Sequence, residues 1–179
     1  MENKPAVFFD RDGVLNKDIG YLHKIEDFSW LDGAVEAIKY CNDHGYWAFV
    51  VTNQSGIARG YYTEADVQLL HKEVNALLRA KGAHVDAFFY CPHHPQGIIN
   101  LYRKKCSCRK PGTEMIRQAA QSYPIDMKHS LLIGDKESDM QCAEKAGLLG
   151  VRFNGGNLKD IFDCPELKIH LGENNDSTF

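Results

Sequence analysis

The sequence predicts an α/β domain built around a central parallel sheet. Short, fully apolar runs alternate along the chain with amphipathic stretches of helical periodicity. An apolar run without polar alternation is typical of a strand buried on both faces, and such strands belong to parallel sheets with helices on both sides. With 179 residues, 44% hydrophobic and 25% charged, the chain has the size and composition of one globular domain.

Each expected strand is a short, β-prone apolar run that is followed by loop residues. A further run, Ile169 to Leu171, is expected to add an edge strand, and the polar tail from Glu173 onward is expected to fray. The five main strands are expected over residues 6–9, 47–51, 87–90, 131–133 and 149–153.

The amphipathic stretches between these runs are expected to form helices. Asp32 can cap the first of them, and Gly45 supplies its stop signal. Thr63 caps the second and longest. The apolar face of that second helix contains Val67, Leu70, Val74, Leu77 and Leu78. The four expected helices span residues 33–44, 64–80, 113–123 and 138–146. Residues 1–179 are therefore expected to form a single domain with a three-layer, Rossmann-like fold.

Charge and composition exclude several classes of protein. The net charge is −3, with acidic and basic residues mixed, whereas nucleic-acid binders more often carry a basic balance or stripe. The sequence shows no signal segment and no apolar stretch of membrane-spanning length. We therefore expect a cytoplasmic protein whose six cysteines do not form a disulfide framework, and in the cytoplasm clustered cysteines more often bind metal. A monomer is expected, although no sequence feature determines the oligomeric state.

Polar side chains follow three of the expected strands at the edge where parallel sheets bind ligands. Asp10 and Asp12 follow the first strand and can face the same side, since they are two apart on an extended chain end. Two such carboxylates repel each other unless a hard divalent cation lies between them, and Asp135 after the fourth strand can complete its coordination. Thr52 after the second strand offers hydroxyl and backbone donors to a phosphate. Each motif alone is an ordinary turn, but their joint order indicates phosphoryl chemistry.

A second cluster lies in the loop after the third strand, over about residues 91–108. It contains Cys91 and His93, followed twelve residues later by Cys106 and Cys108. Three thiolates and one imidazole form a closed tetrahedral zinc site, which is the structural kind. His94 is an alternative to His93, because the two are adjacent and spacing alone does not separate them.

The zinc loop continues directly into Arg109 and Lys110. Between Asp12 and Trp47 there is room for one helix and a long loop, but not for a lid domain. We therefore expect the zinc loop to hold Arg109 and Lys110 over the site in place of a lid.

These motifs resemble the four motifs of the haloacid dehalogenase (HAD) superfamily of phosphohydrolases. The matching positions are residues 10–15, Thr52 with Asn53, Lys110, and Asp135 with Asp139. The motifs occur in the same order along the chain as in the superfamily. Three of them follow an expected strand, and Lys110 lies in the loop before the helix expected over residues 113–123. Asp139, one helical turn beyond Asp135, is expected outside the first coordination sphere of the metal.

The resemblance implies a role for each residue. Asp10 would attack phosphorus and form an aspartyl-phosphate. Asp12 would protonate the leaving alcohol and then activate water. Mg²⁺ would be held by Asp10, Asp135 and the backbone carbonyl of Asp12. Lys110 and Thr52 would bind the transferring phosphoryl group.

Over about residues 6–153 the chain resembles the D-glycero-D-manno-heptose 1,7-bisphosphate 7-phosphatases, which act in bacterial synthesis of the nucleotide-activated heptose of lipopolysaccharide. The matching signatures span residues 18–23, 52–60, 91–97, 106–111 and 134–136. The resemblance implies zinc at Cys91, His93, Cys106 and Cys108. It implies a sugar bisphosphate as the partner, with substrate contacts from Asp18, Ile19, Gly20, Tyr21, Asn53, Gln54, Ser55, Arg109 and Lys136.

Two other functions remain open from the sequence. Histidinol-phosphate phosphatase resembles this chain in nucleophile and zinc loop, and differs in having no second substrate phosphate to bind. A zinc-loop nucleic-acid-binding module with an inactive phosphatase core is a different class. The intact Asp10, Asp12, Lys110 and Asp135, together with the net acidity, argue against that module.

Overall fold

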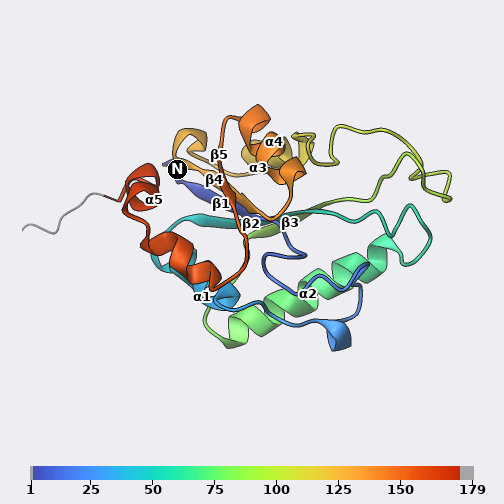
Figure 1. The fold of residues 1–179 in the computed structure, drawn as a ribbon, viewed down its shortest axis with the longest axis horizontal. Coiled ribbons are helices and arrows are strands. Elements are labelled where there is room, and N and C mark those ends of the chain that lie inside the picture. Colours follow the sequence, from blue (N-terminus) through green and yellow to red (C-terminus); the bar gives the residue numbers. More distant parts are fainter. Residues whose placement is uncertain (1, 174–179) are drawn as a thin grey trace, which may run out of the picture.

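The computed structural model describes residues 2–173 and confirms the three-layer α/β fold, with a parallel sheet between two layers of helices (Figure 1). The five strands lie in the order β3-β2-β1-β4-β5, and every pair is parallel. Their bounds are β1 (Ala6–Phe9), β2 (Trp47–Asn53), β3 (Ala87–Cys91), β4 (Leu131–Gly134) and β5 (Leu149–Arg152). All five strands that the sequence predicts are confirmed, with ends shifted by at most two residues.

The sheet has two buried faces because alternate strand residues point to opposite sides. Val7 and Phe9 of β1 pack in one core with α1 and α2, whereas Ala6 and Phe8 pack in the other with α3 and α4. Figure 1 shows α3 and α4 above the sheet and α1 and α2 below it. The helices span α1 (Ala34–Asp43), α2 (Glu64–Ala80), α3 (Glu114–Ser122), α4 (Glu137–Ala146) and α5 (Pro165–His170), with short 3-10 helices η1 (Ile25–Asp27), η2 (Met127–His129) and η3 (Leu158–Asp163).

The predicted start of α2 is confirmed. Thr63 Oγ1 accepts a hydrogen bond from the Asp66 amide, and the Asp66 carboxylate accepts one from the Thr63 amide, which is a reciprocal capping box. The predicted apolar face is wrong at Leu77, whose exposed fraction is 42%, whereas His71 is buried in this face. The prediction rests on hydrophobic residues alone, and it therefore misses the buried His71.

The predicted cap of α1 is wrong. Gly33, not Asp32, is the N-cap residue of α1, and no side chain bonds there. Gly33 adopts φ +75°, and a Cβ atom at this position would lie 1.8 Å from Asn157 Oδ1. Both the conformation and the close approach of Asn157 therefore require glycine at the start of the helix.

The predicted edge strand at Ile169 to Leu171 is also wrong. Residues Pro165–His170 form α5, which begins with Pro165 in the first helical turn, where proline is favoured. Glu173 is held in place, since Tyr40 and Tyr46 both donate hydrogen bonds to its Oε1 atom, at 2.7 and 2.8 Å. The rest of the tail that was expected to fray, residues 174–179, lies outside the described residues.

The order in which strands are added to the sheet switches sides at β1. Strands β2 and β3 extend from one side of β1, and β4 and β5 extend from the other. The carboxyl ends of β1 and β4 therefore flank a crevice, which is where open parallel sheets bind ligands. The connection from β1 to α1 is loop with only η1 in it, so no large cap covers this edge in the described part of the chain.

Within residues 2–173, none of the helices has both the length and the apolar character needed to cross a membrane.

Candidate active site

A cleft of about 410 Å³ lies at the carboxyl ends of the strands, and a small hollow of about 40 Å³ shares part of its wall. Tyr62 and Ser138 line the cleft but are not among the site residues that the sequence predicts. Every other residue that lines the cleft is one of those predicted catalytic or substrate-binding residues. Asp10 and Thr52 line the small hollow. Ile19 lines neither, and half of its surface is exposed to solvent.

Three carboxylates and one ammonium group meet at the base of this site. Oxygen atoms of Asp10, Asp135 and Asp139 lie within 4.8 Å of one another. Lys110 Nζ lies 2.9 Å from Asp10 Oδ1 and 2.6 Å from Asp139 Oδ1. Gly13 is close to Asp135, and a Cβ atom on Gly13 would lie 2.3 Å from Asp135 Oδ2. The glycine of the first motif therefore makes room for the carboxylate that follows β4.

The carboxylate cluster fits a divalent cation. Three carboxylates against one ammonium group leave an excess of two negative charges. Asp135 Oδ1 is buried and has no hydrogen-bond partner among the described residues. Burial raises the pKa of Asp10 to about 7, with Lys110 acting against this rise and Asp139 adding to it. An oxygen-ligated cation such as Mg²⁺ would satisfy Asp135 and offset the charge.

Lys110 is fixed by three kinds of contact. Its Nζ atom donates to the Val51 carbonyl at 2.8 Å, in addition to its two ion pairs. The Asn53 side chain pairs with the Lys110 backbone, accepting from its amide at 2.9 Å and donating to its carbonyl at 3.2 Å. Burial lowers the pKa of Lys110, but Asp10 and Asp139 outweigh burial and the net pKa is raised. The lysine is therefore a fixed cation at the base of the site.

Asp139 takes part in the site, although the sequence places it outside the metal's first coordination sphere. Its Oδ2 atom accepts from the Lys136 amide at 3.1 Å and thereby caps the start of α4. Its other oxygen faces Lys110. Asp139 thus joins the start of α4 to the fixed lysine.

Asp12 faces the cleft from the other side. The Asp12 carboxylate accepts hydrogen bonds from Arg11, Asn16 and Gln54. Gln54 also donates to Thr52 Oγ1 at 2.8 Å. The Gln54 amide, which the sequence assigns to the substrate, is therefore already engaged with protein groups.

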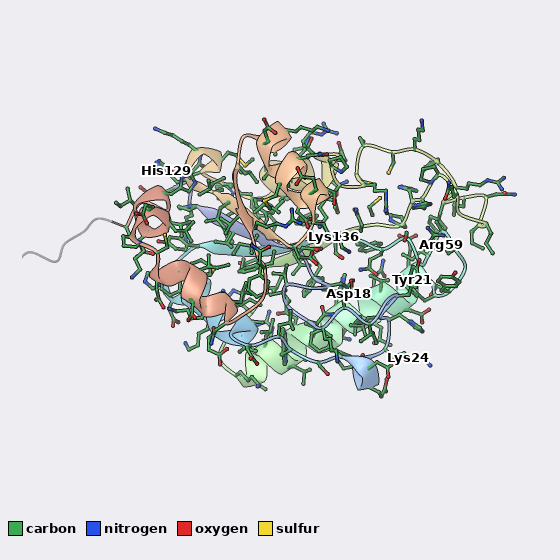
Figure 2. The ribbon with its side chains drawn as sticks, in the orientation of Figure 1. Asp18, Tyr21, Lys24, Arg59, His129 and Lys136 are labelled. Atoms are coloured by element: carbon green, nitrogen blue, oxygen red, sulfur yellow. The ribbon has the colours of Figure 1, made fainter. Side chains whose placement is uncertain are left out.

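The mouth of the cleft lies between two loops. Figure 2 shows Asp18 and Tyr21 on the β1–α1 connection and Lys136 just after β4. Lys136 Nζ lies 3.8 Å from Asp18 Oδ2, and the other Asp18 oxygen accepts from the Gly20 amide at 3.0 Å. Tyr21 adopts φ +55°, which is uncommon for a residue with a side chain, and its ring packs against Tyr61. The turn directs Gly20 and Tyr21 to the cleft.

The four side chains that the sequence assigns to zinc lie close together. Cys91, Cys106, Cys108 and His93 Nδ1 form one cluster. The Sγ atoms of Cys91 and Cys106 are 3.5 Å apart, and those of Cys106 and Cys108 are 3.4 Å apart. His93 Nδ1 lies 3.2 Å from Cys108 Sγ. The hydrogen bond between Cys91 and Cys108 lowers the pKa of the Cys108 thiol and raises that of the Cys91 thiol. This donor set fits zinc in a site with no open position.

His94 is not part of this cluster. Its Nδ1 atom accepts from the Gln96 amide at 3.1 Å, and its Nε2 atom lies 3.4 Å from Arg59 Nη2. Of the two histidines that spacing leaves open, the structure therefore places His93 at the cluster.

The sulfur cluster and the cleft are joined by the backbone. The Arg109 amide donates to Cys106 Sγ at 3.4 Å, and the next residue is the fixed Lys110. Arg109 lines the cleft, and its Nη1 atom is buried without a hydrogen-bond partner in the described chain. The cluster thus anchors the backbone of Arg109, and the Nη1 atom of its guanidinium group is left able to donate hydrogen bonds to a ligand.

Sequence reasoning did not single out Arg11, Tyr62 or His71 for the site. Arg11 is buried, with an exposed fraction of 1%, although a charged loop residue normally indicates solvent exposure. No spacing rule connects it with His71, which lies 60 positions further along the chain. The signal in the sequence is the unbroken run of three charged residues from Asp10 to Asp12, directly after a buried strand.

The chain is similar in sequence to a known protein family and to several curated proteins. A family model described as HAD-hydrolase-like matches residues 107–160. A D-glycero-beta-D-manno-heptose-1,7-bisphosphate 7-phosphatase of Rhodopseudomonas palustris is 43% identical over 89% of this chain and 88% of its own length. A D-glycero-alpha-D-manno-heptose-1,7-bisphosphate 7-phosphatase of Photorhabdus laumondii is 48% identical over 83% of this chain and 81% of its own.

Two solved structures are also similar. A HAD-like phosphatase of Mesorhizobium loti superposes with a TM-score of 0.86 at 32% identity, covering 99% of this chain and 91% of that one. A D,D-heptose 1,7-bisphosphate phosphatase of B. bronchiseptica, in complex with magnesium and phosphate, superposes with a TM-score of 0.75 at 32% identity. The match covers 89% of this chain and 86% of that one. The predicted fold and superfamily are therefore confirmed.

Proposed function

Because this chain belongs to the D-glycero-D-manno-heptose 1,7-bisphosphate 7-phosphatase family, we propose that it hydrolyses the C7 phosphate of that bisphosphate. The product would be heptose 1-phosphate, an intermediate on the way to nucleotide-activated heptose. The observation that carries the proposal is the cluster of Asp10, Asp135 and Asp139 around Lys110 at the base of a cleft.

Asp10 is the nucleophile in this proposal. One of its carboxylate oxygens attacks phosphorus, the bond from phosphorus to the C7 oxygen breaks, and an aspartyl-phosphate forms. Asp12 donates a proton to the departing C7 oxygen. Water then attacks phosphorus, Asp12 takes the proton of that water, and the bond to Asp10 breaks to release phosphate. The two carboxylates line the same small hollow, which supports this division of work.

The charge of the phosphoryl group is balanced by fixed groups of this chain. Lys110 lies beside Asp10, and Thr52 lines the same hollow. Asp10, Asp135 and the carbonyl of Asp12 would hold Mg²⁺, which when bound neutralises phosphoryl oxygens and orients them for displacement. The magnesium complex of the B. bronchiseptica relative supports this choice of metal.

The second phosphate of the substrate is assigned to Arg109. A guanidinium group binds a phosphate with two parallel hydrogen bonds, and Arg109 offers a buried, unpartnered Nη1 atom at the cleft. The loop of Asp18 to Tyr21, together with Ser55 and Lys136, encloses the sugar from other sides of the cleft. A primary phosphate on a carbon arm reaches a recessed nucleophile more readily than a phosphate held against the ring.

Zinc is assigned to Cys91, His93, Cys106 and Cys108. The chemistry of the donor set supports a structural ion, since all four positions are filled by protein. Its effect on catalysis would be indirect, through the placement of Arg109 and Lys110.

The test is the identity of the product. The purified protein with Mg²⁺ and heptose 1,7-bisphosphate, supplied as each anomer in turn, should release one phosphate and leave the anomeric phosphate in place, as followed by ³¹P NMR. Loss of the anomeric phosphate instead would contradict the proposal.

Two comparisons in the same assay address the other functions that the sequence leaves open. Histidinol phosphate should be a much poorer substrate than the bisphosphate, since it has no group for Arg109. A gel shift with oligonucleotides should show no complex. Faster turnover of histidinol phosphate would favour that phosphatase, and a complex without turnover would favour the nucleic-acid-binding module.

A further inference from the structure

The Asp12 carboxylate is held by three donor side chains: Asn16, whose Nδ2 atom donates to Oδ1 at 2.9 Å, and Arg11 and Gln54, which are anchored by residues outside the loop of Asp12. Arg11 donates from Nη2 to both Asp12 oxygens at 3.1 Å and from Nε to Oδ1 at 3.3 Å. Gln54 Nε2 donates to Asp12 Oδ2 at 3.2 Å. Arg11 and Gln54 are almost fully buried, with exposed fractions of 1% and 2%, so neither moves freely.

Arg11 is itself anchored by His71. Its Nη2 atom donates to the Leu22 carbonyl at 2.9 Å, and its Nη1 atom lies 3.1 Å from His71 Nε2. A guanidinium group has donors only, so His71 Nε2 must accept, and the imidazole is neutral with its proton on Nδ1. Burial, followed by the charge of Arg11, holds the pKa of His71 well below its usual range, which agrees with a neutral imidazole.

His71 is fixed in turn by the helix layer. It belongs to α2, has an exposed fraction of 4%, and stacks on Phe88 of β3 with ring centroids 4.5 Å apart. It lines neither the cleft nor the small hollow. Among the described residues, His71 is therefore connected to the site through Arg11.

Gln54 has an equivalent anchor in Tyr62. The Tyr62 hydroxyl donates to Gln54 Oε1 at 2.7 Å, which turns the amide so that Nε2 faces Asp12 and Thr52. Without that hydroxyl the amide could turn over and present its oxygen to the Asp12 carboxylate, which would repel it.

We infer that His71 and Tyr62 are positioning residues for Asp12, acting through Arg11 and Gln54, and that they hold its carboxyl group where it transfers the proton to the leaving alcohol. The inference rests on the proposed function, in which Asp12 is the proton donor. Neither residue is required to touch the reacting phosphate.

A positioning role differs from a structural one in its dependence on the leaving group. The C7 alkoxide of the sugar needs a proton as it departs, whereas 4-nitrophenolate is stable without one. Since kcat/KM reports the steps up to departure of the leaving group, a misplaced Asp12 should lower it for heptose 1,7-bisphosphate and leave 4-nitrophenyl phosphate almost unchanged. A loss of folded protein would lower both equally.

The variants are His71→Leu, which removes the acceptor, and His71→Gln, whose amide oxygen can replace Nε2 as acceptor for Arg11. His71→Leu should lower kcat/KM for the bisphosphate about tenfold and for 4-nitrophenyl phosphate less than about twofold. His71→Gln should recover most of the loss. Tyr62→Phe should show the same selectivity with a loss of about fivefold.

Two controls separate the possible outcomes. Leu78→Ala removes a buried side chain from the same face of α2 without touching Arg11, and should affect both substrates equally if it affects them at all. Asp12→Asn should show the same leaving-group selectivity as the two anchors, at about a hundredfold.

If Asp12→Asn is selective and His71→Leu and Tyr62→Phe lower both substrates to the same extent, the inference is overturned and the proposed function stands. If Asp12→Asn itself lowers both substrates equally in kcat/KM, the proton-donor role fails and the inference falls with it.

Discussion

Residues 2–173 contain two clusters of side chains that could hold a metal ion, and the clusters differ in chemistry and in access. The carboxylate cluster of Asp10, Asp135 and Asp139 has oxygen ligands, carries excess negative charge and opens on a small hollow beside the cleft. The sulfur cluster of residues 91–108 has one imidazole and three thiols that already face one another at 3.2–3.6 Å, apart from one closer pair.

This difference indicates different tasks. Oxygen ligands with charge to spare suit a hard cation that shares its coordination with a substrate, whereas a complete set of soft ligands suits an ion that stays in place. The backbone from Cys108 to Lys110 connects the two, so the closed cluster can determine the geometry of the open one.

The largest effect is expected at the open cluster. Asp10→Asn should lower kcat about a thousandfold or more, because an amide is a poor nucleophile. Phosphate release measures the loss, and circular dichroism should show an unchanged fold. Residual activity within tenfold of the wild type would contradict the assignment of Asp10.

Chelation should separate the two clusters. Brief treatment with EDTA should lower turnover about a hundredfold or more and leave about one zinc per chain, because thiolate ligands retain the ion much longer than carboxylates do. Added Mg²⁺ should restore activity. Elemental analysis is the measurement, and loss of zinc in step with activity would mean that the clusters are not independent.

The residue that follows the sulfur cluster should show a substrate-dependent effect. Arg109→Ala should cost about 2–3 kcal/mol in kcat/KM for the bisphosphate, roughly 30- to 150-fold, and much less for a sugar monophosphate. Arg103→Ala is the matched control, since Arg103 is an exposed arginine of the same loop whose side chain, among the described residues, bonds to Asn100 and not to the site. Equal losses on both substrates would place Arg109 at the transferring phosphate.

The smallest of these effects is expected from the closed cluster. Cys106→Ser and Cys108→Ser should lower the zinc content and reduce kcat/KM roughly tenfold, because Arg109 and Lys110 lose their anchor. Cys164→Ser, at an exposed cysteine outside the cluster, should change neither quantity. A zinc-free variant with full activity would refute the coupling between the clusters but not the metal site.

The sequence predicts the sheet and both clusters because each depends on local pattern. Apolar runs locate the strands, and polar residues at their ends meet because parallel strands end at the same edge. The paired spacing of Cys91 with His93 and of Cys106 with Cys108 locates the sulfur cluster.

What the sequence does not predict depends on contacts between distant segments. Ile169 belongs to a helix because Pro165 can begin one, and Gly33 begins α1 because Asn157 lies against it. Arg11 and His71 are buried because each satisfies the other, which no hydrophobic pattern records. Gln54 looks like a substrate contact in the sequence, but Tyr62 turns its amide toward Asp12.

The role of Asp10 as nucleophile is tested most directly by a search for the phosphoryl group on the enzyme during turnover. The protein is mixed with Mg²⁺ and heptose 1,7-bisphosphate, quenched in acid within the first turnovers, digested and analysed by mass spectrometry. We expect a phosphoryl group on the peptide that contains Asp10, lost on longer incubation and absent in Asp10→Asn, with heptose 1-phosphate as the product. Rapid release of phosphate with no phosphorylated Asp10 peptide at any quench time would contradict this role of Asp10.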